Sequence, residues 1–173
     1  MEIQLEPFAD QRGFFMRIFD ERTFSELNIP TRWVQENHSM NLYKGTIRGL
    51  HFLLPPHTDA KLIRCCRGEI FDVVVDLRKG SPTFGQWDAY HLKEDDFRWI
   101  YIPKGFAHGY CCMSDRSEII YKHDSYYQKE ADSGIVWNDS QIDIAWPYDQ
   151  PVVSEKDQNL QSLHEFISTI GGI

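Results

Sequence analysis

Short runs of β-branched and aromatic residues, separated by turn residues, recur along most of this chain. Such runs are typical of β-strands. Between them, Arg67-Gly68 suits a tight hairpin, and Pro103-Lys104-Gly105 ends one run before the next begins. The pattern predicts eight strands: Arg32–Val34, Thr46–Leu53, Lys61–Cys66, Glu69–Asp76, Trp87–Leu92, Arg98–Ile102, His108–Met113 and Glu118–Asp124. Eight short strands favour an all-β barrel or jelly roll.

Helical signals are few and lie near the two ends of the chain. Asp20 can cap a short helix that continues to Glu26. Ser154 can cap a second helix, whose apolar positions share one face: Leu160, Leu163, Phe166 and Ile167. We therefore expect short peripheral helices around a β body.

Length and composition indicate one globular domain. We expect residues 1–173 to form a single unit, because no repeat, linker or change of composition divides them. Eighteen Lys and Arg against 26 Asp and Glu give a net charge of −8, which repels the backbone of nucleic acids. No apolar run approaches the roughly 20 residues of a membrane span, and the first residues are acidic, unlike a signal peptide. These features predict a cytoplasmic protein without a nucleic-acid or membrane partner.

The four cysteines agree with that compartment. They fall in two adjacent pairs, Cys65-Cys66 and Cys111-Cys112, and neither pair has the spacing of a metal or redox motif. Neighbours on a strand point to opposite faces, so we expect one cysteine of each pair to be buried and the other to face outward.

Two histidine segments stand out within the β pattern. They are Gly45–His51 and Pro103–His108, and both resemble the motifs of a cupin barrel. Metal-binding cupins supply a second histidine two residues after the first, because alternate strand residues share a lumen. Leu53 occupies that position here and cannot bind a metal, so we expect no metal site.

A larger set of motifs, which follow one another along the chain, resembles those of the dTDP-4-dehydrorhamnose 3,5-epimerase family. The resemblance extends from about residue 8 to about residue 160. It rests on Asp10–Phe15, Gln35–Ser39, Arg48–His51, Lys61–Arg64, Phe71–Gly85, Gly105–Gly109, Tyr121, Tyr126-Tyr127, Trp137–Asp139, Trp146-Pro147 and Ser154–Asp157.

This resemblance implies a cupin-like jelly roll that acts on a nucleotide-linked 4-keto-6-deoxyhexose without a metal or redox cofactor. It also implies a homodimer that exchanges an amino-terminal strand. The segment before Asp10 is shorter than the family's usual amino-terminal strand, so a smaller dimer contact is expected.

The resemblance also suggests catalytic roles. A ketone at C4 acidifies the hydrogens at C3 and C5, so inversion needs a base, a stabilised enolate oxygen and an acid on the opposite face. His51 is the candidate base and Asp157 its partner. Tyr121 matches the phenol that returns a proton from the far side. Lys61 and Arg48 can supply positive charge near the C4 oxygen.

Other motif residues are candidates for substrate binding. Arg12 is expected to contact phosphate or the partner subunit. Gln35 and Asn37 can read the edge of a base or sugar. His108 is expected to line the same lumen as His51.

Each assignment has a structural alternative. His51 can be a packed histidine, Asp157 can complete a capping box with Ser154, Tyr121 can be a half-buried aromatic residue, and Lys61 can be a solvated edge charge. Four histidines match no motif role and are expected at the surface: His57, His91, His123 and His164.

Two departures from the family leave the substrate open. The family usually has glutamine where Leu53 and Asp59 stand; Leu removes the amide hydrogen bonds, and Asp adds a charge that would repel a nearby phosphate. Epimerisation at C3 or C5 alone, on a CDP- or GDP-sugar, therefore remains an alternative. A non-catalytic sugar-nucleotide-binding cupin and a metal-dependent cupin oxygenase are weaker alternatives.

Overall fold

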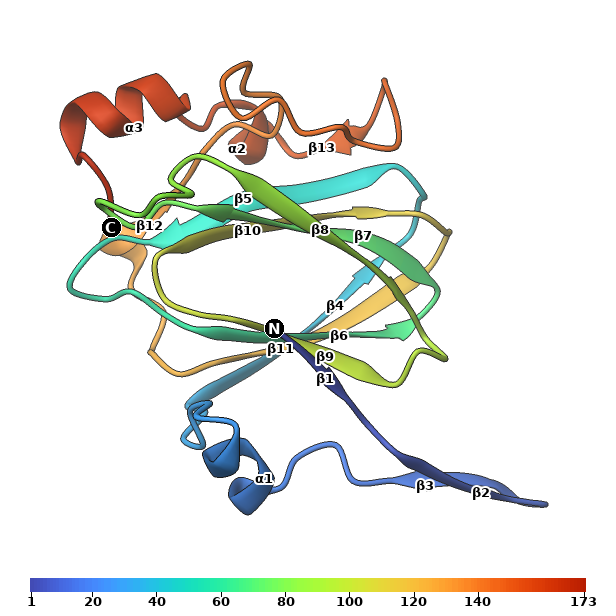
Figure 1. Cartoon of the computed structure of the whole chain (residues 1–173). Helices are drawn as coiled ribbons and strands as arrows, with labels where there is room; N and C mark the ends of the chain where they lie inside the picture. The colour runs from blue at the N-terminus through green and yellow to red at the C-terminus, as the bar shows by residue number, and fades with distance from the viewer.

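Two β-sheets face each other in the computed structural model, which describes residues 1–173 (Figure 1). The β6 sheet has the strand order β1-β9-β6-β11-β4, and the β10 sheet has the order β12-β5-β10-β7-β8, with β13 added beside β5. The all-β prediction is confirmed, and the sheets form a sandwich rather than a closed barrel. No helix is long and apolar enough to cross a membrane.

The strands of the two sheets come from all parts of the sequence. The β6 sheet consists of β1 (Glu2–Gln4), β4 (Gln35–Asn41), β6 (Lys61–Arg67), β9 (Arg98–Ile102) and β11 (Ser117–His123). The β10 sheet consists of β5 (Thr46–Leu53), β7 (Glu69–Asp76), β8 (Trp87–Lys93), β10 (Phe106–Cys112), β12 (Asp132–Gly134) and β13 (Val152–Val153). Seven of the eight predicted strands match these elements, three of them with identical bounds.

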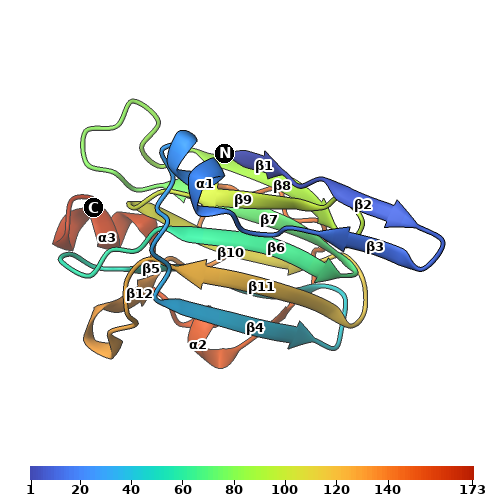
Figure 2. The same cartoon turned by 90° about the horizontal axis from the view of Figure 1, so that it is seen from below.

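The predicted strand Arg32–Val34 is wrong. The chain forms β4 at Gln35–Asn41 instead, at the edge of the β6 sheet (Figure 2). This strand is almost entirely polar, because one face looks into a polar pocket and the other is solvent-exposed. A search for runs of β-branched and aromatic residues therefore misses it.

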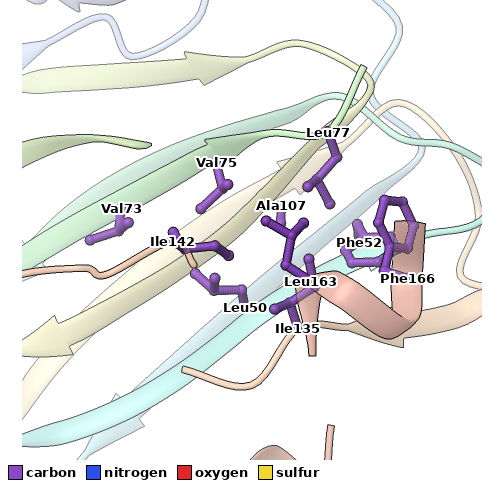
Figure 3. Packing of buried hydrophobic residues seen from close by; sticks show 10 residues of the cluster. All are labelled: Leu50, Phe52, Val73, Val75, Leu77, Ala107, Ile135, Ile142, Leu163 and Phe166. Carbon is purple, nitrogen blue, oxygen red and sulfur yellow. The ribbon is translucent and has the colours of Figure 1, made fainter. Parts of the chain in front are cut away.

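Three apolar layers hold the sandwich together. One fills the space between the sheets, with Val74, Ile100 and Ile119 among its members. A second lies under helix α1 (Glu21–Glu26), on the outer face of the β6 sheet. The third covers the outer face of the β10 sheet (Figure 3) and consists of Leu50, Phe52, Val73, Val75, Leu77, Ala107, Ile135, Ile142, Leu163 and Phe166.

Because both faces of the β10 sheet are covered, its central strands are apolar throughout. Val73 and Val75 of β7 face the outer layer, and Val74 faces the space between the sheets. Since both faces of β10 are covered, Cys111 and Cys112 are both buried, although they point to opposite faces of the strand. The expectation that one of them faces outward is therefore wrong. All four cysteines are free thiols.

Both predicted helix caps, Asp20 and Ser154, are confirmed, but the second helix is shorter than predicted. Asp20 caps α1 by accepting from the Thr23 N–H. The predicted helix after Ser154 is two helices, α2 (Glu155–Gln158) and α3 (Leu163–Thr169), and α3 begins with its own capping box at Ser162. The break turns α3 onto the β10 sheet (Figure 1).

A two-stranded hairpin projects from the body of the molecule (Figures 1 and 2). It is formed by β2 (Pro7–Asp10) and β3 (Gly13–Met16). Phe8 and Phe15 are paired across the hairpin and are 67% and 66% exposed. An isolated hairpin has little stability of its own, so this one presents an aromatic surface that nothing in the chain covers.

We predict that Phe166→Ala in α3 lowers the free energy of unfolding by about 3–5 kcal/mol, because the phenyl ring is fully buried between the helix and Phe52. The neighbouring Ile167 is 43% exposed, and Ile167→Ala should change stability by about 0.5 kcal/mol or less. Urea denaturation followed by tryptophan fluorescence measures both. Equal losses in the two variants would contradict the docking of α3 through Phe166.

Candidate active site

A cavity of about 460 Å³ opens between the two sheets at one end of the sandwich. This volume suits a small-molecule ligand. The β10 sheet contributes Arg48, His51, Phe52, Leu53, His108, Tyr110 and Asp132 to its lining. The β6 sheet contributes Gln35, Asn37, Lys61, Tyr121 and His123, and the remaining lining residues are Asp59, Ser125, Tyr127 and Lys156. Most predicted site residues therefore meet in one place.

His51 and Asp157 form a pair at this cavity. His51 Nε2 donates to Asp157 Oδ1 at 2.8 Å. An ionised carboxylate only accepts, so Nε2 carries the proton and Nδ1, which has no partner in the chain, is the basic nitrogen. A capping role alone does not account for Asp157. Its backbone N–H donates to Ser154 Oγ, but its carboxylate accepts from His51 and from the Gly49 N–H.

The Asp157 carboxyl is held in its ionised form. Burial alone would raise its pKa, but the hydrogen bonds and charge of His51, with the Gly49 N–H, lower the pKa below its ordinary 3.8. Because Asp157 stays negatively charged, it stabilises the imidazolium that forms when His51 takes up a proton.

A β-bulge brings Arg48 and His51 to the same face of β5. The two residues are three positions apart, which on a regular strand would place them on opposite faces. Their partners on β10 are Tyr110 and His108, only two positions apart, so β5 contains one extra residue. Both side chains consequently line the cavity.

Gly49 is required within this bulge. It has φ +119, a backbone conformation that favours glycine, and a Cβ there would come within 2.6 Å of the Gly109 Cα. A larger residue would push β5 and β10 apart.

His108 lies directly opposite His51 on the neighbouring strand. Its Nε2 donates to Asp72 Oδ1 at 2.7 Å, and the Asp72 side chain is fully buried. The cavity thus has two histidine–carboxylate pairs on one wall, and His108 lines the same cavity as His51.

Arg48 reaches across the cavity to the other sheet. Its Nε donates to Asn41 Oδ1 of β4 at 2.7 Å, and Asn41 Nδ2 in turn donates to the Tyr110 hydroxyl at 3.3 Å. No carboxylate pairs with Arg48, whereas His51, His108, Lys61, His123 and Lys156 each have one. Arg48 is therefore the cationic lining residue whose charge is not balanced by the chain.

Tyr121 faces this wall from the β6 sheet. Burial raises the pKa of its phenol above 10, and the positive charge of Arg48 only partly opposes this. The phenol is therefore protonated near neutral pH and can act as a proton donor.

Lys61 is buried rather than a solvated edge charge. It opens β6, an inner strand, and its Nζ donates to Asp59 Oδ1 at 2.8 Å. Asp59 Oδ2 accepts from His123 Nδ1 at 2.5 Å. The charge of Asp59, which was expected to repel a nearby phosphate, is thus balanced by two basic side chains that share its carboxylate.

The expectation that His123 lies at the surface is also wrong. Its ring lines the cavity and stands edge-on to Tyr121, with ring centroids 5.4 Å apart. A signal was present in the sequence: His123 follows Tyr121 by two positions on a strand, which places the two side chains on one face.

Polar residues at the rim complete the cavity. Lys156 of α2 donates to Asp132 Oδ2 at 2.6 Å, and the Tyr127 hydroxyl donates to the same oxygen at 3.1 Å. Gln35 Oε1 accepts from the Tyr127 N–H, which ties the β4 edge to this rim.

Arg12 is the predicted site residue that the structure does not bring to the cavity. It lies in the turn of the β2–β3 hairpin and forms an exposed ion pair with Asp10. Its contact with substrate from a second subunit stays a prediction. No group of three or more His, Cys, Asp or Glu side chains is arranged to hold a metal ion.

Comparison with known proteins gives consistent results. The family model described as dTDP-4-dehydrorhamnose 3,5-epimerase matches residues 1–165. The enzyme of that name from Shigella flexneri is 47% identical over 155 residues, covering 89% of this chain and 85% of the relative.

Two crystal structures closely resemble this fold. The dTDP-4-dehydrorhamnose 3,5-epimerase of Bacillus anthracis, with TDP and PPi bound, has a TM-score of 0.92 and 43% identity, covering 94% of this chain and 93% of that one. The dTDP-6-deoxy-D-glucose-3,5-epimerase of Legionella pneumophila, in complex with dTDP-4-keto-L-rhamnose, has a TM-score of 0.89 and 41% identity, covering 94% and 87%.

Proposed function

Because this chain belongs to the dTDP-4-dehydrorhamnose 3,5-epimerase family, we propose that it inverts C3 and C5 of a dTDP-linked 4-keto-6-deoxyhexose through an enolate. One observation carries the proposal: a histidine–carboxylate pair and a protonated phenol face one cavity from opposite sheets. Inversion needs removal of a proton from one face of the sugar and delivery to the other, and this arrangement supplies both groups.

His51 acts as the base. Its Nδ1 takes the hydrogen from C3 or C5, whose acidity comes from the adjacent C4 ketone. Asp157 holds the ring through Nε2 and stabilises the imidazolium that results. Tyr121 then delivers its phenolic proton to the opposite face of the carbanion. Before the second carbon is inverted, and again before the next turnover, His51 releases its proton to solvent and the Tyr121 phenolate takes one up.

Charge that develops on the C4 oxygen requires cationic donors. Lys61 and Arg48 line the cavity and are the donors we assign to it. Arg48, which no carboxylate neutralises, can also bind the diphosphate, together with Lys156 at the rim. Gln35 and Asn37 offer amide groups to the thymine or deoxyribose.

The two closely similar structures bear on the nucleotide. One is described with TDP and the other with a dTDP-sugar bound, and this supports dTDP over the alternative CDP and GDP sugars. Mass spectrometry after incubation in D₂O tests the assignment with dTDP-, CDP- and GDP-4-keto-6-deoxyglucose. Two deuterium atoms in the dTDP-sugar support two inversions, one supports a single site, and none contradicts the proposal.

We predict that His51→Asn abolishes deuterium exchange at both carbons. A general base acts on the transition state, so turnover should fall by roughly 10²–10⁴ or more while dTDP binding stays within a few-fold. NMR measures exchange, and calorimetry measures binding. If His51→Asn retains wild-type turnover, the base lies elsewhere and His108 becomes the candidate.

For Tyr121→Phe we predict that exchange and inversion separate. His51 still removes and returns the hydrogen, but the far face has no proton donor, so deuterium enters with retained configuration. Tyr126 is 59% exposed and does not line the cavity, so Tyr126→Phe serves as the control. Equal small decreases of both rates in Tyr121→Phe would assign Tyr121 a packing role only.

The active form is proposed to be a homodimer. The exposed Phe8 and Phe15 of the β2–β3 hairpin need a cover, and a second copy of the chain would supply it. The same hairpin carries Arg12, which could then reach the partner's cavity.

Light scattering should accordingly give a mass of twice 20.4 kDa at micromolar concentration. Phe15→Ser is expected to shift the mass toward the monomer. Ile170→Ser, at the end of α3 and away from the hairpin, removes an exposed apolar side chain without this effect (Figure 1). A wild-type mass of 20.4 kDa would contradict the dimer.

A further inference from the structure

Asp59, Lys61 and His123 form a buried cluster on the wall that the β6 sheet contributes to the cavity. Lys61 opens β6 and His123 closes β11, and the strand register places the two residues directly opposite each other. Asp59 joins them, with Oδ1 accepting from Lys61 Nζ at 2.8 Å and Oδ2 from His123 Nδ1 at 2.5 Å. One carboxylate therefore fixes the positions of two basic side chains.

The Asp59 carboxylate is a permanent anion. Its side chain is 3% exposed, and burial alone would raise its pKa. The hydrogen bond and charge of His123, with those of Lys61, outweigh burial and lower the pKa from 3.8 to about 2. A neutral side chain at this position would leave no anion between Lys61 and His123.

Both basic side chains keep donor capacity for a ligand. Lys61 uses one of its three ammonium hydrogens on Asp59. His123 uses Nδ1, and its Nε2 has no partner in the chain although the ring lines the cavity. Because Nδ1 donates to Asp59, Nε2 is protonated only in the imidazolium, which the Asp59 anion stabilises; in that form Nε2 can donate to a ligand oxygen that Lys61 also contacts.

The charges of the cluster show what such an oxygen should be. Lys61 and Asp59 neutralise each other, whereas an imidazolium at His123 leaves one net positive charge. The other titratable group that faces His123 on this wall is Tyr121, a neutral phenol, and Gln35 opposite it on β4 is uncharged. A ligand oxygen that develops a single negative charge would neutralise the net positive charge of the cluster.

Resting on the epimerase function proposed above, we propose that His123 donates from Nε2 to the C4 oxygen beside Lys61, and that Asp59 is the positioning residue for both. The C4 oxygen becomes an enolate oxygen when His51 removes a proton from C3 or C5. Donors fixed before the reaction stabilise that charge most strongly in the transition state, so they affect kcat more than KM.

The histidine variants test the contact directly. His123→Ala should lower kcat for dTDP-4-keto-6-deoxyglucose by about 10²–10³, the usual effect of losing one donor to an oxyanion, with KM and the Kd for dTDP within a few-fold. His123→Gln keeps an N–H donor without a charge and should recover part of the loss. Wild-type kcat in His123→Ala, or a loss confined to KM, would overturn the proposal.

The positioning role of Asp59 is tested by a double-mutant cycle. Asp59→Asn removes the anion at constant size and should also lower kcat more than it raises KM. If Asp59 acts through His123 and Lys61, the Asp59→Asn/His123→Ala double variant should lose less than the product of the two single effects. Full additivity would overturn the positioning role, and if Asp59→Asn fails to fold, the His123 variants decide the proposal.

His38→Ala provides a matched control. His38 also pairs with a carboxylate in the β6 sheet, with 3.0 Å between its Nε2 and Glu118 Oε2, but it does not line the cavity. Its kcat should equal that of the wild type. Absence of deuterium exchange in the wild type would contradict the epimerase function itself, whereas exchange that is unchanged in His123→Ala would contradict only the role of this cluster.

Discussion

The close approach of β5 and β10 at Gly49 and Gly109 is the constraint on which the site depends. The bulge it accommodates turns both Arg48 and His51 toward the space between the sheets. The same backbone presents the Gly49 N–H to Asp157, the carboxylate that orients His51. The proposed base, its partner carboxylate and an unbalanced cation therefore all depend on a contact that only glycine permits.

Much of the fold was predictable because most strands are apolar on at least one face. Thr46–Leu53, Glu69–Asp76 and Arg98–Ile102 were predicted with the bounds they have. The polar strand β4 was missed because its faces contact a polar cavity and solvent. The single helix predicted after Ser154 was wrong because its apolar spacing continues across a break, and a separate capping box at Ser162 starts α3.

The site was predictable where its residues match family motifs, and less so where this chain departs from them. His51, Lys61, Tyr121 and the predicted binding residues other than Arg12 meet at one cavity, with Asp157 hydrogen-bonded to His51. The pairing of Asp59 with His123 could not be predicted from either residue alone, because the two are far apart in sequence. Strand register between β6 and β11, which one sequence does not specify, brings them together.

Along β6 and β11 the inward-facing side chains change from apolar to polar, so these strands contribute both to a packed core and to a charged cavity. The inward-facing residues of β6 run from Lys61 through Ile63 to Cys65, and their partners on β11 are His123, Tyr121 and Ile119. The apolar end of this series belongs to the layer between the sheets, while the polar end lines the cavity.

Burying charged groups such as Lys61 and Asp59 costs free energy unless they are paired, and here the carboxylate contacts both basic side chains. The apolar layers on the outer faces of the two sheets offset what remains of that cost, since they hold the strands in place without contributing to the cavity. Substitutions in those outer layers should therefore change stability first, whereas substitutions at the polar ends of the same strands should change catalysis first.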